Sequence, residues 1–172
     1  MTDTNQVRLR AVELHDLAFT RKCRNDPRVH LPALGRRFPI TEVGEEEWFR
    51  SLGQGPTPSE VTYIVARATD EVAIGLTTLR QIDWINRTAM FGVWIAPDAQ
   101  HNGLGKAATA EMLAVAFGRL NLRKIALEVL ASNERAVSLY RGLGFVEEGR
   151  FVDQMFLDGK YEDVIRMAIV AP

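Results

Sequence analysis

The sequence of this chain is arranged around Gln100-His101-Asn102-Gly103-Leu104-Gly105-Lys106. This segment follows a run typical of a β-strand, residues 88–96, and leads into an apolar-faced stretch that predicts a helix over residues 104–120. The first N–H groups of a helix lack partners within the chain, and the helix dipole adds positive partial charge there. Gly103 and Gly105 permit torsion angles closed to other residues and leave no Cβ between the main chain and a ligand. A strand, a glycine loop and a helix start in that order predict an anion site that fits a pyrophosphate.

Length and composition indicate one globular domain over residues 1–172, with 47% apolar and 25% charged residues. The net charge of −1 predicts neither a nucleic-acid partner nor a membrane partner. A single cysteine, Cys23, excludes an internal disulfide and fits a reducing compartment. The polar N-terminus and the lack of a long apolar run predict no signal peptide and no membrane span, hence a soluble, cytoplasmic protein.

Around the glycine loop the sequence predicts strands and helices that share one sheet. Alternating apolar residues place a strand at residues 7–11. Runs rich in β-forming residues, separated by turn signals, place the others at residues 61–68, 72–83, 88–96, 124–130, from 145 onward, and 161–170. Helical spacing and capping residues place the helices at residues 14–24, 41–52, 104–120 and 133–142. Residues 28–40 and 53–59 are predicted as irregular loops, and Asp158-Gly159 as a two-residue hairpin turn. The predicted fold is α/β, with a mixed, mostly antiparallel sheet of six or seven strands and helices on both faces.

Two other phosphate loops fit poorly. Gly103-x-Gly105-x-x-Ala108 matches the dinucleotide-binding fingerprint, with Glu128 near the position of its ribose acid. In that fold, however, the first glycine follows its strand almost at once, whereas residues 97–102 intervene here. A Walker loop fails because Lys106 is followed by alanine and no glycine stands at position 100.

The pattern Gln100-x-x-Gly103-x-Gly105 instead resembles the acetyl-CoA pyrophosphate loop of the GNAT-type N-acetyltransferases. A second block agrees with that superfamily's N-x-x-A-x-x-L-Y-x-x-x-G-F segment at every specified position: Asn133-Glu134-Arg135-Ala136-Val137-Ser138-Leu139-Tyr140-Arg141-Gly142-Leu143-Gly144-Phe145. The likeness extends over residues 7–170 and is greatest to the branch of spermidine, ribosomal-protein N-terminal and amino-sugar acetyltransferases. It implies a GNAT-like sheet whose one parallel pair of strands splays apart.

The second block also has a physical reading of its own. Asn133 and Tyr140 are seven residues apart, about 20° from alignment on a helix, with Ala136 on the same stripe. Asn133 can cap the helix or reach a ligand amide, and Ala136 is small enough for a thin ligand to pass over it. Alternatively, Asn133 is only a cap and Tyr140 a core aromatic.

The resemblance implies acetyl-CoA as the acetyl-donor cosubstrate, with its pantetheine arm in the gap between the splayed strands. The cofactor-binding residues it implies are Val93, Trp94 and Ile95 on the first strand, Gln100, His101, Asn102, Gly103, Leu104, Gly105 and Lys106 in the loop, and Asn133, Ala136 and Tyr140 on the next helix. In the first strand, Gly92 is expected to mark a bulge or a close backbone approach.

For catalysis, Tyr140 is the implied general acid that protonates the leaving thiolate. Glu128 is the implied general base, acting directly or through water, because Leu127-Glu128-Val129-Leu130-Ala131-Ser132-Asn133 resembles the corresponding segment of ribosomal-protein N-terminal acetyltransferases. Asp83, His101 and residues 45–47 are weaker candidates for the base. No metal site is predicted, because none of the three histidines has a ligand partner at useful spacing.

The acceptor implied by the resemblance is a primary amine, either a small molecule (a polyamine or an amino sugar) or a peptide N-terminus. The run Glu45-Glu46-Glu47 can supply carboxylates to a polyamine pocket, but three consecutive glutamates on a helix are more typical of a solvated face. A homo-oligomer, dimer or larger, is also implied. The alternative is a non-catalytic acyl-CoA-binding regulatory module, and the sequence leaves the length of the acyl group open.

Overall fold

The structure is a computed structural model, and it describes residues 6–34, 38–54 and 57–172. Its strands are β1 (Val7–Arg10), β2 (Glu60–Arg67), β3 (Ala73–Asp83), β4 (Thr88–Ile95), β5 (Lys124–Leu130), β6 (Val146–Leu157) and β7 (Lys160–Val170). Its helices are α1 (Leu17–Arg24), α2 (Pro27–His30), α3 (Glu42–Ser51), α4 (Leu104–Ala114) and α5 (Glu134–Gly142). Single 3-10 turns lie at Leu14–Asp16 and Pro97–Ala99, and a π-helical turn at Val115–Arg119 continues α4.

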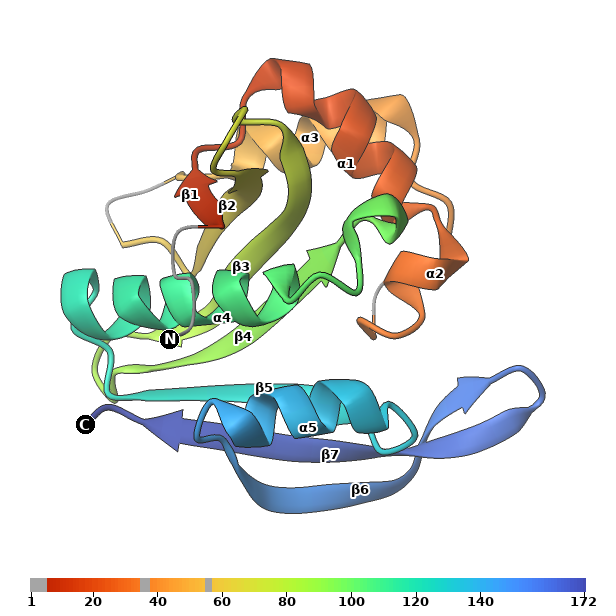
Figure 1. The fold of residues 1–172 in the computed structure, drawn as a ribbon, viewed down its shortest axis with the longest axis vertical. Coiled ribbons are helices and arrows are strands. Elements are labelled where there is room, and N and C mark those ends of the chain that lie inside the picture. The colour runs from red at the N-terminus through yellow and green to blue at the C-terminus, as the bar shows by residue number, and fades with distance from the viewer. Residues whose placement is uncertain (1–5, 35–37, 55–56) are drawn as a thin grey trace.

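The strands form one seven-stranded sheet in the order β1-β2-β3-β4-β5-β7-β6. Every neighbouring pair is antiparallel except β4 and β5, which run parallel. A parallel pair needs a crossover between its strands, and α4 supplies it. The predicted mixed sheet with one parallel pair is therefore confirmed (Figure 1).

The parallel pair is short. Only three residues of each strand are in register, from Thr88 opposite Lys124 to Met90 opposite Ala126. Beyond Met90, β4 continues to Ile95 beside β3, whereas β5 continues to Leu130 beside β7. The two halves of the sheet therefore diverge from this point, and Figure 1 shows the opening between β4 and β5. The splayed pair implied by the resemblance is present.

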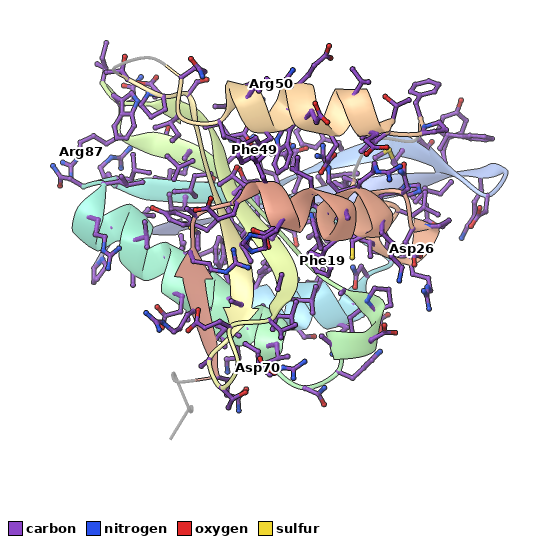
Figure 2. The ribbon with its side chains drawn as sticks, turned by 90° about the horizontal axis from the view of Figure 1, so that it is seen from above. Phe19, Asp26, Phe49, Arg50, Asp70 and Arg87 are labelled. Carbon is purple, nitrogen blue, oxygen red and sulfur yellow. The ribbon has the colours of Figure 1, made fainter. Side chains whose placement is uncertain are left out.

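Helices cover both faces of the sheet. On one face, α4 and α5 bury a core that includes Phe91, Met112, Leu127 and Val137. On the other face, α1 and α3 cover Ile64 and Leu76, and Figure 2 shows these two helices lying side by side. The central strands carry consecutive buried residues, such as Ile64–Ala66 of β2 and Ile74–Thr77 of β3, because both faces of the sheet are covered.

The N-terminal third differs from the prediction at two places. Residues 28–40 were expected to be irregular, but Pro27–His30 form the short helix α2, because Asp26 caps the Arg28 N–H and proline fits the first helical turn. Residues 45–47 were expected to form a solvated face of a helix, and this prediction is wrong for Glu45, which is 1% exposed. Thr41 caps α3 as predicted. Parts of the two predicted loops, residues 35–37 and 55–56, lie outside the described residues.

The C-terminal hairpin of β6 and β7 turns at Asp158-Gly159, as predicted. Leu157 pairs with Lys160, and both turn residues have positive φ, which is the backbone that a two-residue hairpin of this kind requires. Because β5 ends opposite Val164, the hairpin projects beyond it (Figure 1).

Across the described ranges, none of the helices has the length and apolar character needed to cross a membrane.

Candidate active site

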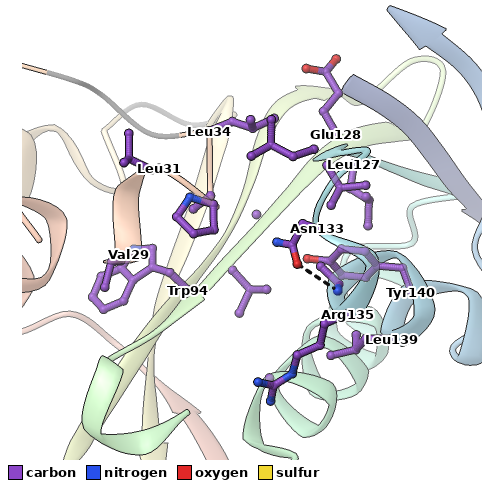
Figure 3. Close-up of a pocket in the computed structure, with 18 of the residues that line it drawn as sticks. Val29, Leu31, Leu34, Trp94, Leu127, Glu128, Asn133, Arg135, Leu139 and Tyr140 are labelled. Carbon is purple, nitrogen blue, oxygen red and sulfur yellow. Dashed lines mark hydrogen bonds between the residues drawn. The ribbon is translucent and has the colours of Figure 1, made fainter. Parts of the chain in front are cut away.

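A cavity of about 840 Å³ occupies the region where β4 and β5 diverge. Its walls come from α2 and the residues after it, from β3 and β4, from the glycine loop, from β5 and α5, and from the β6–β7 hairpin. All predicted site residues line it except Asn102. Figure 3 shows the side chains that converge on it from β5, α5 and the residues after α2.

The glycine loop forms one end of this cavity. Gly103 is the N-cap of α4 and has a φ of 75°, a left-handed conformation that glycine adopts without a steric penalty. Among the described residues, the N–H groups of Gly103, Leu104 and Gly105 have no hydrogen-bond partner, since the first helical bonds run from Lys106 and Ala107 to the Gly103 carbonyl. These free N–H groups at a helix start are suited to a phosphate.

Gly105 does not use the left-handed torsion angle that glycine permits. Gly105 lies within α4 with no positive φ, and a Cβ there would make only ordinary contacts with Ile95 and Leu139, at 3.8 and 3.9 Å. It does line the cavity, so its contribution is a bare backbone facing a ligand rather than an unusual torsion angle.

Side chains around the loop hold its shape. The Gln100 side-chain amide donates to the Ile95 carbonyl at 2.9 Å, which ties the loop to the end of β4. His101, with a φ of 71°, is hydrogen-bonded through its Nδ1 to the guanidinium of Arg135 in the first turn of α5. Both side chains line the cavity close to Lys106 and the free N–H groups. This end of the cavity is therefore positively charged, as a pyrophosphate requires.

Helix α5 presents the predicted stripe to the cavity. Asn133 is the N-cap, and its Oδ1 accepts a hydrogen bond from the Ala136 N–H at 3.2 Å (Figure 3). The cap uses only the oxygen, so the Asn133 side-chain N–H groups are left for a ligand. Asn133, Ala136 and Tyr140 all line the cavity, which agrees with a thin ligand lying along this helix.

Tyr140 is wedged between two aromatic rings. Its ring centroid lies 6.3 Å from that of Phe91 on β4 and 5.6 Å from that of Phe145, both in edge-to-face geometry. Burial raises the pKa of Tyr140 to about 12, because the charged phenolate is poorly solvated there. Within the described residues its hydroxyl has no hydrogen-bond partner, and it faces the cavity (Figure 3). Tyr140 is thus a neutral proton donor at neutral pH.

Glu128 lies on β5 and does not meet Tyr140. Figure 3 shows its carboxylate pointing away from the tyrosine. Its Oε1 lies 3.6 Å from the Arg166 guanidinium on β7, and both side chains are 39% exposed. The pair is long and solvated, so it holds Glu128 only weakly. A carboxylate so placed can accept a proton through water or after a change of rotamer.

On β4, Val93, Trp94 and Ile95 line the cavity as predicted. Trp94 packs against Phe19 of α1 with ring centroids 5.9 Å apart. No register shift occurs at Gly92, so this residue marks no bulge, and a Cβ there would lie 3.3 Å from a methyl group of the Thr78 side chain. The bulge is in β3, between Arg80 and Asp83.

Several lining residues escaped sequence reasoning. Arg80 and Gln81 line the cavity at the β3 bulge. Arg135 lines it from α5, and Leu31 and Leu34 line it from the segment that follows α2. Only Arg135 had a usable signal, since it lies one residue before Ala136 on a helix already assigned to the cofactor. The weaker candidates for the base, Asp83 and residues 45–47, are not among the lining residues.

Two diverging strands, free N–H groups at a helix start and a neutral phenol farther along the wall are suited to an extended thioester that carries phosphates. That places the chain among the acyl-CoA-dependent acyltransferases. Residues 6–146 match the acetyltransferase (GNAT) domain, so the chain belongs to the GNAT family. It is an acetyl-CoA-dependent N-acetyltransferase.

Three comparisons illustrate the relationship. The chain is 34% identical to the spermidine N(1)-acetyltransferase of Vibrio cholerae over 96% of its length and 94% of the relative's. The crystal structure of that organism's spermidine N-acetyltransferase with CoA and spermine superposes with a TM-score of 0.89, covering 96% of this chain and 95% of the other. A dodecameric structure of that organism's enzyme, 34% identical, gives a TM-score of 0.82 and covers 96% and 94% of the two chains.

Proposed function

We propose that this enzyme transfers the acetyl group of acetyl-CoA to a small primary amine by direct attack, with Tyr140 as general acid and Glu128 as general base. The amine nitrogen forms a bond to the thioester carbonyl carbon, and the carbon–sulfur bond breaks. The amine loses a proton to Glu128, directly or through water, and the thiolate gains one from Tyr140. The observation that carries this proposal is the divergence of β4 and β5 after Met90, which opens a cavity that both Tyr140 and Glu128 line.

The environment of Tyr140 supports its role as the acid. An acid must be protonated before the step, and the raised pKa keeps the phenol neutral throughout the physiological range. Its hydroxyl faces the cavity and has no partner among the described side chains, so it can reach the sulfur without breaking an existing hydrogen bond. The flanking rings of Phe91 and Phe145 restrict its motion.

The position of Glu128 supports its role as the base. Continuing the register of the parallel pair by two residues past Met90 and Ala126 brings Glu128 opposite Gly92 across the gap. A carboxylate at that point borders the path of an incoming amine. Because its weak ion pair with Arg166 is solvated, a water molecule can relay the proton where the carboxylate does not reach the amine.

Two further parts of the function concern the acceptor and the assembly. The acceptors in the names of the relatives are polyamines, which supports a small amine over a peptide N-terminus as the first class to test. A dodecameric relative supports a homo-oligomer. The edge strand β6 exposes Val152 and Phe156, whose exposed fractions of 71% and 48% are suited to covering by a second copy. Light scattering on the purified protein measures the assembly.

The test is free-thiol release from acetyl-CoA by the purified protein across a panel of amines. The panel holds spermidine and spermine, free and nucleotide-linked amino sugars, aminoglycosides and short peptides. Amine-dependent release supports the proposal and identifies the acceptor class. Binding of acetyl-CoA without release on any amine favours the non-catalytic acyl-CoA-binding module instead.

The base is tested by Glu128→Gln. A direct or water-relayed base predicts a fall in kcat of roughly 10²-fold or more and loss of the acidic limb of the pH profile. Glu71→Gln, which changes an exposed glutamate paired with Arg8 outside the cavity, is the matched control. An unchanged pH profile in Glu128→Gln would remove Glu128 from the mechanism.

A further inference from the structure

The bulge in β3 brings two consecutive polar side chains to the cavity. The register shifts between Arg80 and Asp83, and Gln81 has a φ of 51°, uncommon for a residue other than glycine. Neighbouring side chains of a regular strand point to opposite faces of the sheet, yet both Arg80 and Gln81 line the cavity. Bulges of this kind redirect side chains next to active sites.

The guanidinium of Arg80 extends over the next strand. Arg80 pairs with Met90 of β4, the last residue of that strand in register with β5. A Cβ on Gly92 would lie 3.9 Å from Arg80 Nη2, an ordinary contact, so the guanidinium lies over Gly92 of β4. Its charge therefore sits at the point where the gap begins.

Arg80 and Glu128 border this gap from opposite sides. Met90 and Gly92 lie on the same face of β4, and Ala126 and Glu128 lie on the same face of β5, because side chains alternate along each strand. Since Met90 is opposite Ala126, Gly92 and Glu128 follow on one common face. The proposed base thus has a cation across the gap.

Arg80 is a cation of this cavity, and the acidic residue opposite it on β2, Glu60, accepts hydrogen bonds from Thr62 and Thr78. Arg28 is held by Asp26 at 2.7 Å, and Arg135 is bonded to His101. Lys106 lies in the first turn of α4 beside the phosphate-binding loop. Arg80 belongs to none of the ion pairs found within 4.0 Å among the described residues. A positive charge beside an amine site repels a second ammonium group and attracts an anion.

Resting on the proposed function, we infer that Arg80 binds an anionic group of the acceptor, so that the preferred substrate is a small amine carrying a carboxylate or a phosphate. The amine points to Glu128 and the oxyanion to Arg80, where the planar guanidinium can donate two parallel hydrogen bonds. The Gln81 side chain, turned to the cavity by the same bulge, adds an amide donor. An unsubstituted polyamine has no group to satisfy Arg80.

Acceptors that differ only in the anion test the inference. L-leucine is compared with L-leucinamide, O-phosphoethanolamine with ethanolamine, and spermidine is measured beside them, all by thiol release from acetyl-CoA. The carboxylate of leucine makes its ammonium harder to deprotonate than that of the amide, so a preference for leucine cannot come from amine reactivity. A preference for leucine over leucinamide identifies a carboxylate as the bound anion. A preference for O-phosphoethanolamine over ethanolamine identifies a phosphate.

We expect the anionic member of at least one pair to have a kcat/KM about 10- to 100-fold higher, the effect of a charge-assisted hydrogen bond. Arg80→Gln removes the preference, and Arg80→Lys retains part of it. Arg50→Gln, an exposed arginine on α3 outside the cavity, retains all of it. Arg80 is exposed, so its variants should fold, which their melting temperatures check.

Equal kcat/KM within both pairs, or a preference that survives in Arg80→Gln, overturns the inference. Turnover of spermidine above that of every anionic amine also overturns it and leaves the proposed function intact. Absence of thiol release with every amine overturns the proposed function and the inference together.

Discussion

The rings of Tyr140 and Phe91 meet edge to face, with their planes at 86° and their centroids 6.3 Å apart. Phe91 is the first residue of β4 beyond the segment paired with β5. This contact therefore fastens α5 to β4 at the place where the sheet divides, and it fixes the phenol beside the gap. The position of the proposed acid depends on the same feature that creates the cavity.

Tyr140→Phe should lower kcat by roughly 10²- to 10⁴-fold, the usual contribution of general acid catalysis, with little change in the affinity for acetyl-CoA. The rings still pack, since only the hydroxyl is removed. Steady-state kinetics and calorimetric titration with CoA measure the two quantities. Tyr63→Phe, on β2 and outside the cavity, is the control. Near-normal turnover in Tyr140→Phe would assign the proton to water.

The pH dependence follows from the pKa of about 12 at Tyr140. Turnover should rise with pH as the amine and the base lose protons. No descending limb of the pH profile should occur at any pH up to about 10, because the phenol is still protonated there. A descending limb centred near pH 8 would show that another group supplies the proton.

The raised pKa of Tyr140 also makes the stability of the fold depend on pH. The folded-state pKa is raised above the ordinary value of 10.0, so the unfolded chain releases this proton first as the pH rises. Its contribution is fully present below about pH 10 and is lost as the pH rises toward about 12. Urea midpoints measured across this range should fall less in Tyr140→Phe than in the natural sequence. Parallel curves for the two proteins would contradict the assignment.

Gly103→Val should weaken CoA binding by more than roughly tenfold while the protein still folds. A Cβ at Gly103 meets nothing within 4 Å, so the cost comes from the φ of 75°, on the order of 1–2 kcal/mol for a left-handed residue that is not glycine. The added side chain also stands in front of the free N–H groups. Gly53→Val is a matched control, with a φ of 69°, open space around it and a place outside the cavity. Unchanged CoA affinity in Gly103→Val would refute the phosphate-loop assignment.

Glu45→Gln should destabilise the fold by about 3 kcal/mol, because it leaves a partly buried arginine without its counter-charge. The Glu45 carboxylate accepts from Arg24 at 2.8 Å and from the Thr20 hydroxyl at 2.7 Å, and Arg24 also lies 4.5 Å from the centre of the Trp48 ring. Glu46→Gln removes only an exposed pair with Arg50 on the same helix and should cost less than about 0.5 kcal/mol. Similar urea midpoints for the two variants would show that the buried pair contributes nothing.

The features that could be predicted from the sequence depend on local constraints. A left-handed torsion at Gly103, a helix cap at Asn133, the Asp158-Gly159 turn and the runs of β-forming residues all depend on residues close together in the chain. These requirements were enough to predict the mixed sheet, the phosphate loop and the stripe that carries Tyr140.

Features that depend on segments far apart in the chain could not be predicted from the sequence. The end of the β4–β5 pairing at Met90, the burial of Glu45 against Arg24 and Thr20, and the reach of Arg80 over Gly92 have no local signature. Residues 45–47 are all glutamates, yet Glu45 is buried because α1 packs against α3 at that turn. Burial and the direction of a side chain are properties of packed neighbours, and those neighbours exist only once the chain has folded.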